Sequence, residues 1–76
     1  MPARAFVLVE TAVGRSNEVV ASLRNLGKVK SADRISGPYD VIVTVEAETL
    51  TAIGELVQYH IHSVNGITRT VTCLAV

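Results

Sequence analysis

The sequence predicts one α+β domain in which four strands and two helices follow one another in the order β-α-β-β-α-β. Two observations carry this prediction. The segments 5–10 and 41–46 are short and apolar on both faces, as expected of central strands. The segments 16–26 and 49–64 instead repeat apolar residues at helical spacing. A chain of 76 residues has room for one such domain, residues 1–76.

The first strand is predicted over residues 5–10, and a helix follows it after a loop that contains Gly14. Ser16 is expected to cap the start of this helix, and Gly27 is expected to end it in a left-handed conformation. The apolar stripe between them consists of Val19, Val20, Leu23 and Leu26. This apolar face of the helix is therefore expected to pack against the core.

The second strand is predicted over residues 28–36 and carries charged residues on both faces, which is typical of a sheet edge. Gly37 and Pro38 should then turn the chain sharply into the third strand. In this strand Val41, Val43 and Val45 share one face, while Ile42 and Thr44 share the other. The two strands form a hairpin.

Thr49 or Thr51 is expected to cap the second helix. Its apolar positions are Leu50, Ile53, Leu56, Val57, Ile61 and Val64. Gly54 lies inside this helix at a cost of about 1 kcal/mol relative to alanine, so it is expected to mark a close packing contact. Asn65 and Gly66 should end the helix, and residues 67–76 form the fourth strand.

This order is that of the ferredoxin-like split β-α-β fold, in which two helices cover one face of a four-stranded antiparallel sheet. The first and third strands, which the fold places at the centre, are apolar on both faces. The face that the helices leave open therefore needs a partner, and a second copy of the chain is the simplest one. We expect a homodimer of the dimeric α+β barrel type, in contact through Val41, Val43 and Val45 if theirs is the open face.

Composition excludes several classes of function. Seven basic residues balance seven acidic ones and are scattered along the chain, so direct binding of nucleic acid is not expected. The apolar run from Ala5 to Val9 is too short for a signal sequence or a membrane span. We therefore expect a cytoplasmic protein that does not contact membranes.

The candidate metal ligands and nucleophiles are not expected to form a metal site or a catalytic site. His60 and His62 are two residues apart in a predicted helix, so they should point in different directions and bind no metal. Cys73 is the only cysteine and is expected to be a buried structural thiol. Neither helix stripe offers a titratable group to the cleft between helices and sheet. We expect a protein that is not an enzyme and needs no cofactor.

Three blocks of sequence resemble the effector-binding domain of the Lrp/AsnC transcriptional regulators. They are the apolar strand Phe6–Val9, the turn and strand Gly37–Val45, and Asn65–Thr72, which is similar to the family's Pro-Gly-Val-x-x-Thr-x-Thr close. The chain has no room for the family's helix-turn-helix, so it resembles the stand-alone form. Asn65 stands where the family usually has proline.

The resemblance implies a site for a small effector, usually an amino acid, between dimers that assemble further into rings. By position it implies Gly37, Tyr39 and Asp40 as lining residues, with Thr70 and Thr72 as further candidates. Asp40 would accept hydrogen bonds from an α-ammonium group and is expected to serve the ligand rather than the fold. From local sequence alone, Asp40 is equally a turn-capping acid.

The resemblance also implies a non-enzymatic sensor that modulates a full-length Lrp/AsnC-type regulator or a metabolic partner. Two alternatives stay open at the level of sequence. One is a small enzyme of the dimeric α+β barrel group, such as a monooxygenase or isomerase. The other is an ACT-type amino-acid-binding regulatory domain, which shares the strand order.

Overall fold

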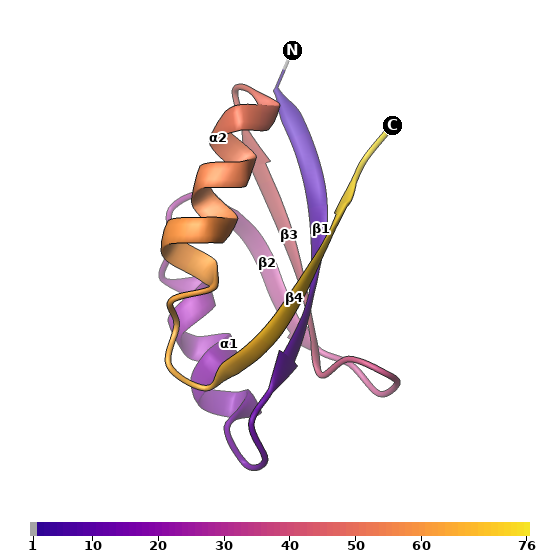
Figure 1. The fold of residues 1–76 in the computed structure, drawn as a ribbon, viewed down its shortest axis with the longest axis vertical. Coiled ribbons are helices and arrows are strands. Elements are labelled where there is room, and N and C mark those ends of the chain that lie inside the picture. Colours follow the sequence, from indigo (N-terminus) through magenta and orange to yellow (C-terminus); the bar gives the residue numbers. More distant parts are fainter. Residues whose placement is uncertain (1) are drawn as a thin grey trace.

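The computed structural model describes residues 2–76, which form four strands and two helical segments (Figure 1). The elements are β1 (Ala3–Thr11), α1 (Ser16–Arg24), β2 (Val29–Arg34), β3 (Val41–Ala47), α2 (Leu50–Glu55), the π-helical turn η1 (Leu56–Ile61) that continues α2, and β4 (Ile67–Leu74). This order confirms the predicted β-α-β-β-α-β arrangement.

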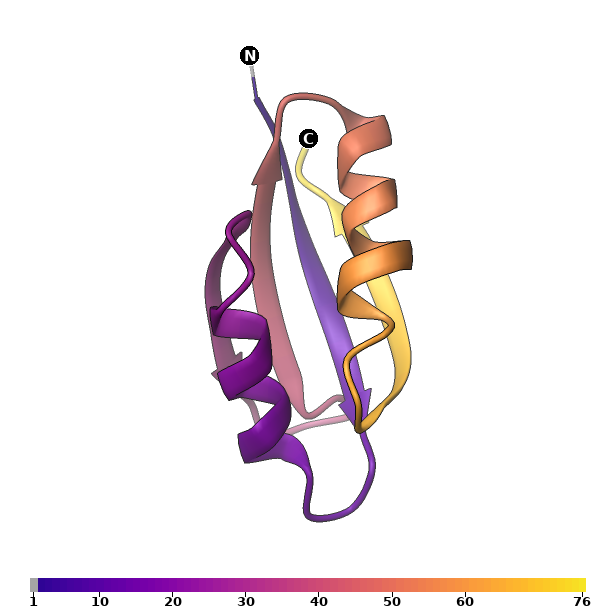
Figure 2. The ribbon, with the colours of Figure 1, turned by 90° about the vertical axis from the view of Figure 1, so that its left-hand side faces the viewer.

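The four strands form one antiparallel sheet in the order β2-β3-β1-β4. The two most apolar strands, β1 and β3, are therefore central, and the charged strand β2 lies at an edge, as predicted. Both helices lie on the same side of the sheet, as the two perpendicular views show (Figures 1 and 2). The fold is ferredoxin-like.

The core lies between the helices and one face of the sheet. Alternate residues of the central strands point into it, and all of the following are fully buried: Ala5, Val7, Val9, Val41, Val43 and Val45. The helices contribute Val19, Val20, Leu23, Ile53, Leu56 and Ile61. The valines of β3 therefore face the helices, and their conditional assignment to the open face is wrong.

The open face of the sheet is formed by the other set of alternating residues. Phe6 and Leu8 of β1 and Ile42 and Thr44 of β3 are partly buried in the single chain, and the register places Val71 of β4 opposite Leu8. Large apolar side chains thus remain in contact with solvent at the centre of this face. This is the surface for which the sequence predicts a partner.

The ends of α1 differ from the prediction. Arg15, not Ser16, occupies the N-cap position, and no side chain caps the helix there. The hydroxyl of Ser16 instead lies 2.8 Å from that of Thr11, with which it shares a hydrogen bond. The helix ends at Arg24 with Asn25 as its C-cap, so Gly27 is not the left-handed residue that ends it.

The second helix begins as predicted but changes its winding. The Thr49 side chain caps α2 by accepting a hydrogen bond of 3.0 Å from the Ala52 amide. In η1 the His62 amide donates to the Val57 carbonyl, five residues back, at 2.8 Å. This wider turn brings residues five apart onto one face, which is why Leu56 and Ile61 are both buried.

Two expectations about α2 are wrong. Leu50 is 58% exposed and lies outside the core, because it is in the first turn of the helix beyond the edge of the packed layer. Gly54 is exposed as well, and a Cβ added there would meet no atom within 4 Å. Within the chain, Gly54 therefore marks an open surface rather than a close contact.

The close approach that a glycine permits is found at Gly66 instead. Gly66 has a φ of +102°, and a Cβ there would lie 3.1 Å from Val19 Cγ2 and 3.2 Å from Arg15 Cβ. Its carbonyl accepts a hydrogen bond of 2.8 Å from the Ala12 amide. The turn before β4 is thus packed directly against the start of α1.

Replacing Gly66 by alanine is expected to lower the free energy of unfolding by about 1–3 kcal/mol, because the residue would be strained and crowded at once. Gly27→Ala is the matched control, since Gly27 lies outside the left-handed region and has open space around it. It should leave stability unchanged or raise it by up to about 1 kcal/mol. Urea unfolding compares the two variants, and equal stabilities would contradict this account.

Candidate functional site

Three connections of the chain meet at one end of the sheet, where β1 ends and β3 and β4 begin (Figure 1, lower end). The Asp40 amide donates to the Val9 carbonyl at 2.9 Å, which joins the β2–β3 turn to β1. The Ala12 amide donates to the Gly66 carbonyl, which joins the β1–α1 loop to the turn before β4. We refer to this region as the sheet end.

Asp40 connects two of these segments through its side chain. Its Oδ2 accepts hydrogen bonds from the Thr11 amide at 2.8 Å and from the Thr11 hydroxyl at 3.3 Å. The same hydroxyl contacts Ser16 at the start of α1. Asp40 therefore ties the β2–β3 turn to the end of β1, a structural role that neither expectation for this residue contained.

The other carboxylate oxygen, Oδ1, takes part in no hydrogen bond within residues 2–76. Asp40 is partly buried, and the two hydrogen bonds from Thr11 to Oδ2 fix the orientation of its carboxylate. A fixed carboxylate with a free oxygen can accept a hydrogen bond from an ammonium group at little entropic cost.

Gly37 and Tyr39 lie in the turn that carries Asp40. Gly37 has a φ of +154°, and the Ile35 amide donates to the Asp40 carbonyl at 2.9 Å, which closes the turn. Tyr39 is partly buried, and the guanidinium carbon of Arg69 lies 6.0 Å from the centre of its ring. The turn thus also contacts the start of β4.

The start of β4 adds polar groups that the sequence reading did not connect with the turn. Thr68 donates a hydrogen bond either to the Glu10 carbonyl, at 3.0 Å, or to the Glu10 carboxylate, at 3.2 Å. Arg69 lies opposite Glu10 in the register of β1 and β4. Only the pairing of these strands places Arg69 next to Tyr39, which lies about thirty residues earlier in the chain.

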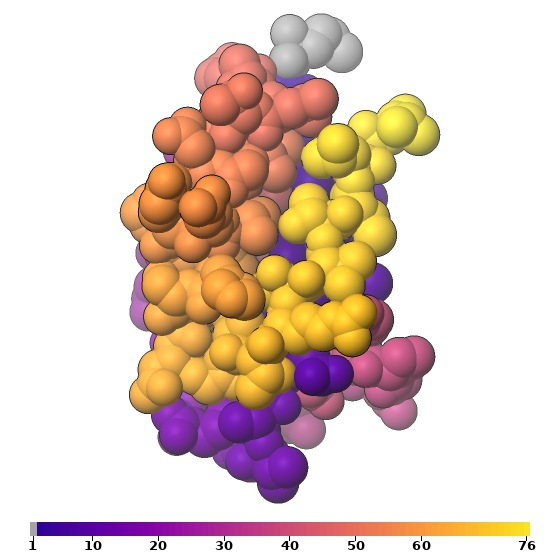
Figure 3. All heavy atoms as spheres, in the orientation of Figure 1, coloured from indigo at the N-terminus to yellow at the C-terminus, as the bar shows by residue number. Residues whose placement is uncertain are grey.

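Thr70 and Thr72 lie elsewhere. They point to the helix side of β4 and line an apolar groove of about 480 Å³ between β4 and the second helix (Figure 3). Its other lining residues are Leu50, Ile53, Gly54, Val57, Gln58, His62 and Leu74. Neither Gly37, Tyr39 nor Asp40 lines this groove, so the five predicted residues occupy two separate places in one chain.

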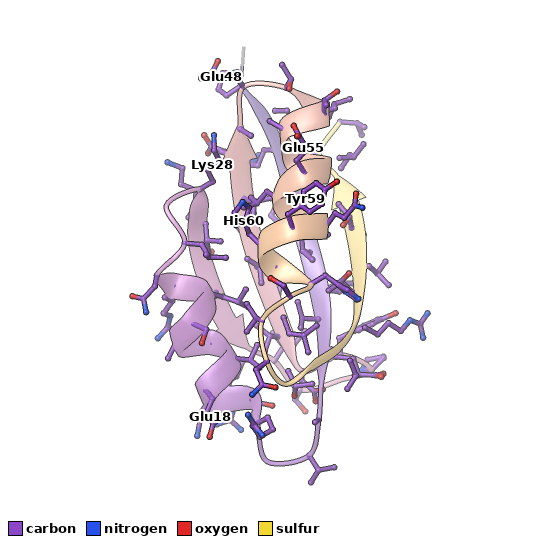
Figure 4. The ribbon with its side chains drawn as sticks, turned by 60° about the vertical axis from the view of Figure 1, so that its left-hand side comes forward. Glu18, Lys28, Glu48, Glu55, Tyr59 and His60 are labelled. Atoms are coloured by element: carbon purple, nitrogen blue, oxygen red, sulfur yellow. The ribbon has the colours of Figure 1, made fainter. Side chains whose placement is uncertain are left out.

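The two histidines lie on different sides of the second helix, as their spacing predicts. His60 lines a shallow hollow with Lys28 and Glu55 on the side facing α1 (Figure 4), whereas His62 lines the groove beside β4. Among residues 2–76, no group of three or more histidine, cysteine, aspartate or glutamate side chains is placed to hold a metal ion.

Cys73 is exposed, so its expected burial is wrong. It lies on the edge strand β4 opposite Phe6, and this places it on the open face of the sheet, where no other element of the chain covers it. The part of the chain that the structure describes contains no helix long and apolar enough to cross a membrane.

The fold and its sheet end define a small ferredoxin-like domain whose polar groups gather at one rim rather than in the core. Residues 4–76 match the Lrp/AsnC ligand binding domain. The chain belongs to this family, which decides against the ACT-type alternative. A comparison with curated protein sequences gave no match.

Several solved structures resemble the whole chain. FFRP-DM1 is 35% identical, with a TM-score of 0.92, and the match covers 97% of this chain and 99% of that one. The hypothetical protein PHS023 from Pyrococcus horikoshii is 36% identical, with a TM-score of 0.90 and coverage of 100% and 90%. The transcriptional regulator NMB0573 from Neisseria meningitidis, solved as an L-Met complex, is 20% identical, with a TM-score of 0.87 and coverage of 97% and 49%.

Asp40→Ala is expected to lower the free energy of unfolding by about 1–3 kcal/mol, because the Thr11 amide loses a charged acceptor in a partly buried place. Asp40→Asn keeps an acceptor oxygen and should cost about 1 kcal/mol or less. Asp33→Ala is the control, because Asp33 is exposed and makes only a long ion pair with Arg24; its cost should be about 0.5 kcal/mol or less. An Asp40→Ala variant as stable as Asp33→Ala in urea would show that the Thr11 contact contributes nothing.

Proposed function

We propose that this domain is a non-enzymatic sensor that binds an amino acid or a similar small effector at the sheet end and assembles into dimers and larger oligomers of dimers. The observation that carries the proposal is the fixed carboxylate of Asp40, with one oxygen bound to Thr11 and the other free, in a domain of a ligand-binding family. The L-Met complex of NMB0573 supports an amino acid as the class of effector.

The chemistry of the proposed site follows from its groups. The free oxygen of Asp40 accepts hydrogen bonds from the effector's ammonium group, and the Gly37 and Tyr39 amides of the turn donate to the effector's carboxylate. Thr70 and Thr72 line a groove that these residues do not share. In the proposed site they therefore belong to a second copy of the chain, and the apolar groove takes the effector's side chain.

The filling of the core supports a binding domain over the enzyme alternative. All side chains that are fully buried between helices and sheet in residues 2–76 are apolar. A monooxygenase or isomerase of the same general fold would need a titratable group in this cleft. A sensor needs none, and it would transmit its state to a full-length Lrp/AsnC-type regulator or another partner through assembly.

The proposed dimer uses the open face of the sheet. Exposing Phe6, Leu8 and Ile42 to water is unfavourable by about 25 cal/mol for each Å² of apolar surface, and a second sheet packed on this face removes that surface from solvent. Both copies would present the same residues, as a two-fold symmetric contact requires.

Ile42→Asp is expected to convert the dimer or larger oligomer into monomer at micromolar concentration, because it would bury an unpaired charge at the centre of the contact. Val13→Asp is the control. Val13 is fully exposed at the tip of the β1–α1 loop, and its replacement should leave the assembly intact. Light scattering coupled to size-exclusion chromatography measures both masses. A wild-type chain that is already monomeric at this concentration would contradict the proposed dimer.

Thermal unfolding of the wild type in the presence of each standard amino acid tests the sensor itself. A ligand present at a hundred times its dissociation constant stabilises the folded state by about 2.7 kcal/mol, which shifts the melting temperature of so small a domain by about 10 °C or more. We expect one or a few related amino acids to give such a shift. The proposal fails if none does so at millimolar concentration.

A further inference from the structure

Arg69 is an arginine beside a carboxylate that it does not pair with. It lies directly opposite Glu10 in the antiparallel register of β1 and β4, where residues of opposite charge normally attract each other. Yet no ion pair within 4 Å joins them in the described part of the chain. The Glu10 carboxylate lies 3.2 Å from the Thr68 hydroxyl instead.

The guanidinium of Arg69 lies over the ring of Tyr39, 6.0 Å from its centre. A cation in this position is attracted by the ring face, and a guanidinium carries all its N–H donors in its own plane. Arg69 is exposed, and it donates no hydrogen bond to another side chain of residues 2–76. Its planar donors therefore have no partner within residues 2–76 and lie next to the Tyr39 ring.

Tyr39 is itself held in place by its neighbour in the chain. The Asp40 amide is bonded to the Val9 carbonyl and the Asp40 side chain to Thr11, so the ring that supports Arg69 stands on a turn fixed at two points. This contact brings a cation next to the turn that carries Asp40, the proposed acceptor for the ligand's ammonium group. A planar guanidinium matches a carboxylate with two parallel hydrogen bonds.

We propose that Arg69, which lies over the ring of Tyr39, binds the carboxylate of the effector, and that the site therefore selects ligands with a free carboxylate. This inference rests on the function proposed above and deepens it. Asp40 accepts hydrogen bonds from the ammonium group, and Arg69 supplies the cation that the turn lacks. The ion pair between Arg69 and the ligand carboxylate then distinguishes an amino acid from its amide or from a simple amine, in addition to any difference in shape.

Isothermal titration calorimetry tests the proposal with two probes: the standard amino acid that gives the wild type its largest thermal shift, and the carboxamide of that same amino acid. The wild type should bind the acid about ten- to a hundredfold more tightly than the amide. In Arg69→Gln this ratio should fall to about one, because the acid loses affinity while the amide keeps it. Arg69→Lys, which keeps the charge but not the planar fork, should be intermediate.

Arg4→Gln is the matched control. Arg4 also lies over an aromatic ring, that of Phe6 at 5.8 Å, but at the opposite end of β1. Its replacement should leave the ratio of acid to amide affinity as in the wild type. The same measurement distinguishes binding of the carboxylate from a role of Arg69 in assembly. A variant that merely dissociates would lose affinity for the acid and the amide equally.

Each other outcome overturns the proposal. If Arg69→Gln binds the acid as the wild type does, or loses acid and amide affinity in parallel, Arg69 does not bind the carboxylate, although the sensor function stands. If the wild type binds no amino acid at millimolar concentration, the proposed function and this inference fail together.

Discussion

Two helices can cover only one face of a sheet whose two central strands are apolar on both. In this chain the helices cover the face with Val7, Val9, Val41 and Val43, all fully buried, and leave Phe6 and Leu8 in contact with solvent. The remainder of the molecule is organised by this imbalance. The core is buried within one chain, the open face is the surface on which we propose a second copy, and the polar groups of the proposed site lie at the ends of the strands.

The sheet end follows from the same arrangement. Because β1 and β3 are central and paired from Ala3 and Ala47 to Val9 and Val41, the segments that leave them are held close to one another. Asp40 and Thr11 join two of these segments, and Gly66 packs the third against α1. Groups placed there keep their orientation without a ligand, which reduces the entropic cost of binding. The exposed rim is therefore a suitable place for the proposed effector site, although the core formed by residues 2–76 contains no polar side chain.

The sequence predicted the elements well, because strand and helix periodicities are local properties, and the Thr49 cap is local too. It did not predict which face of β3 is covered, since Val43 and Ile42 are equally apolar and only helix packing decides between them. The Asp40–Thr11 bond joins residues 29 apart, and local sequence shows only a turn acid. Likewise, Arg69 was one scattered cation among seven until strand pairing placed it beside Tyr39. What the sequence missed depends on contacts between distant segments.

The central claim is that the sheet end recognises the charged groups of an amino acid. A crystal structure of the assembled chain with its tightest-binding amino acid tests it most directly. We predict the ligand carboxylate within hydrogen-bond distance of the Arg69 guanidinium, about 2.7–2.9 Å, and the ammonium group at the free oxygen of Asp40. A ligand held only in the groove between Leu50 and Leu74, with Asp40 and Arg69 of every copy unoccupied, would contradict the account.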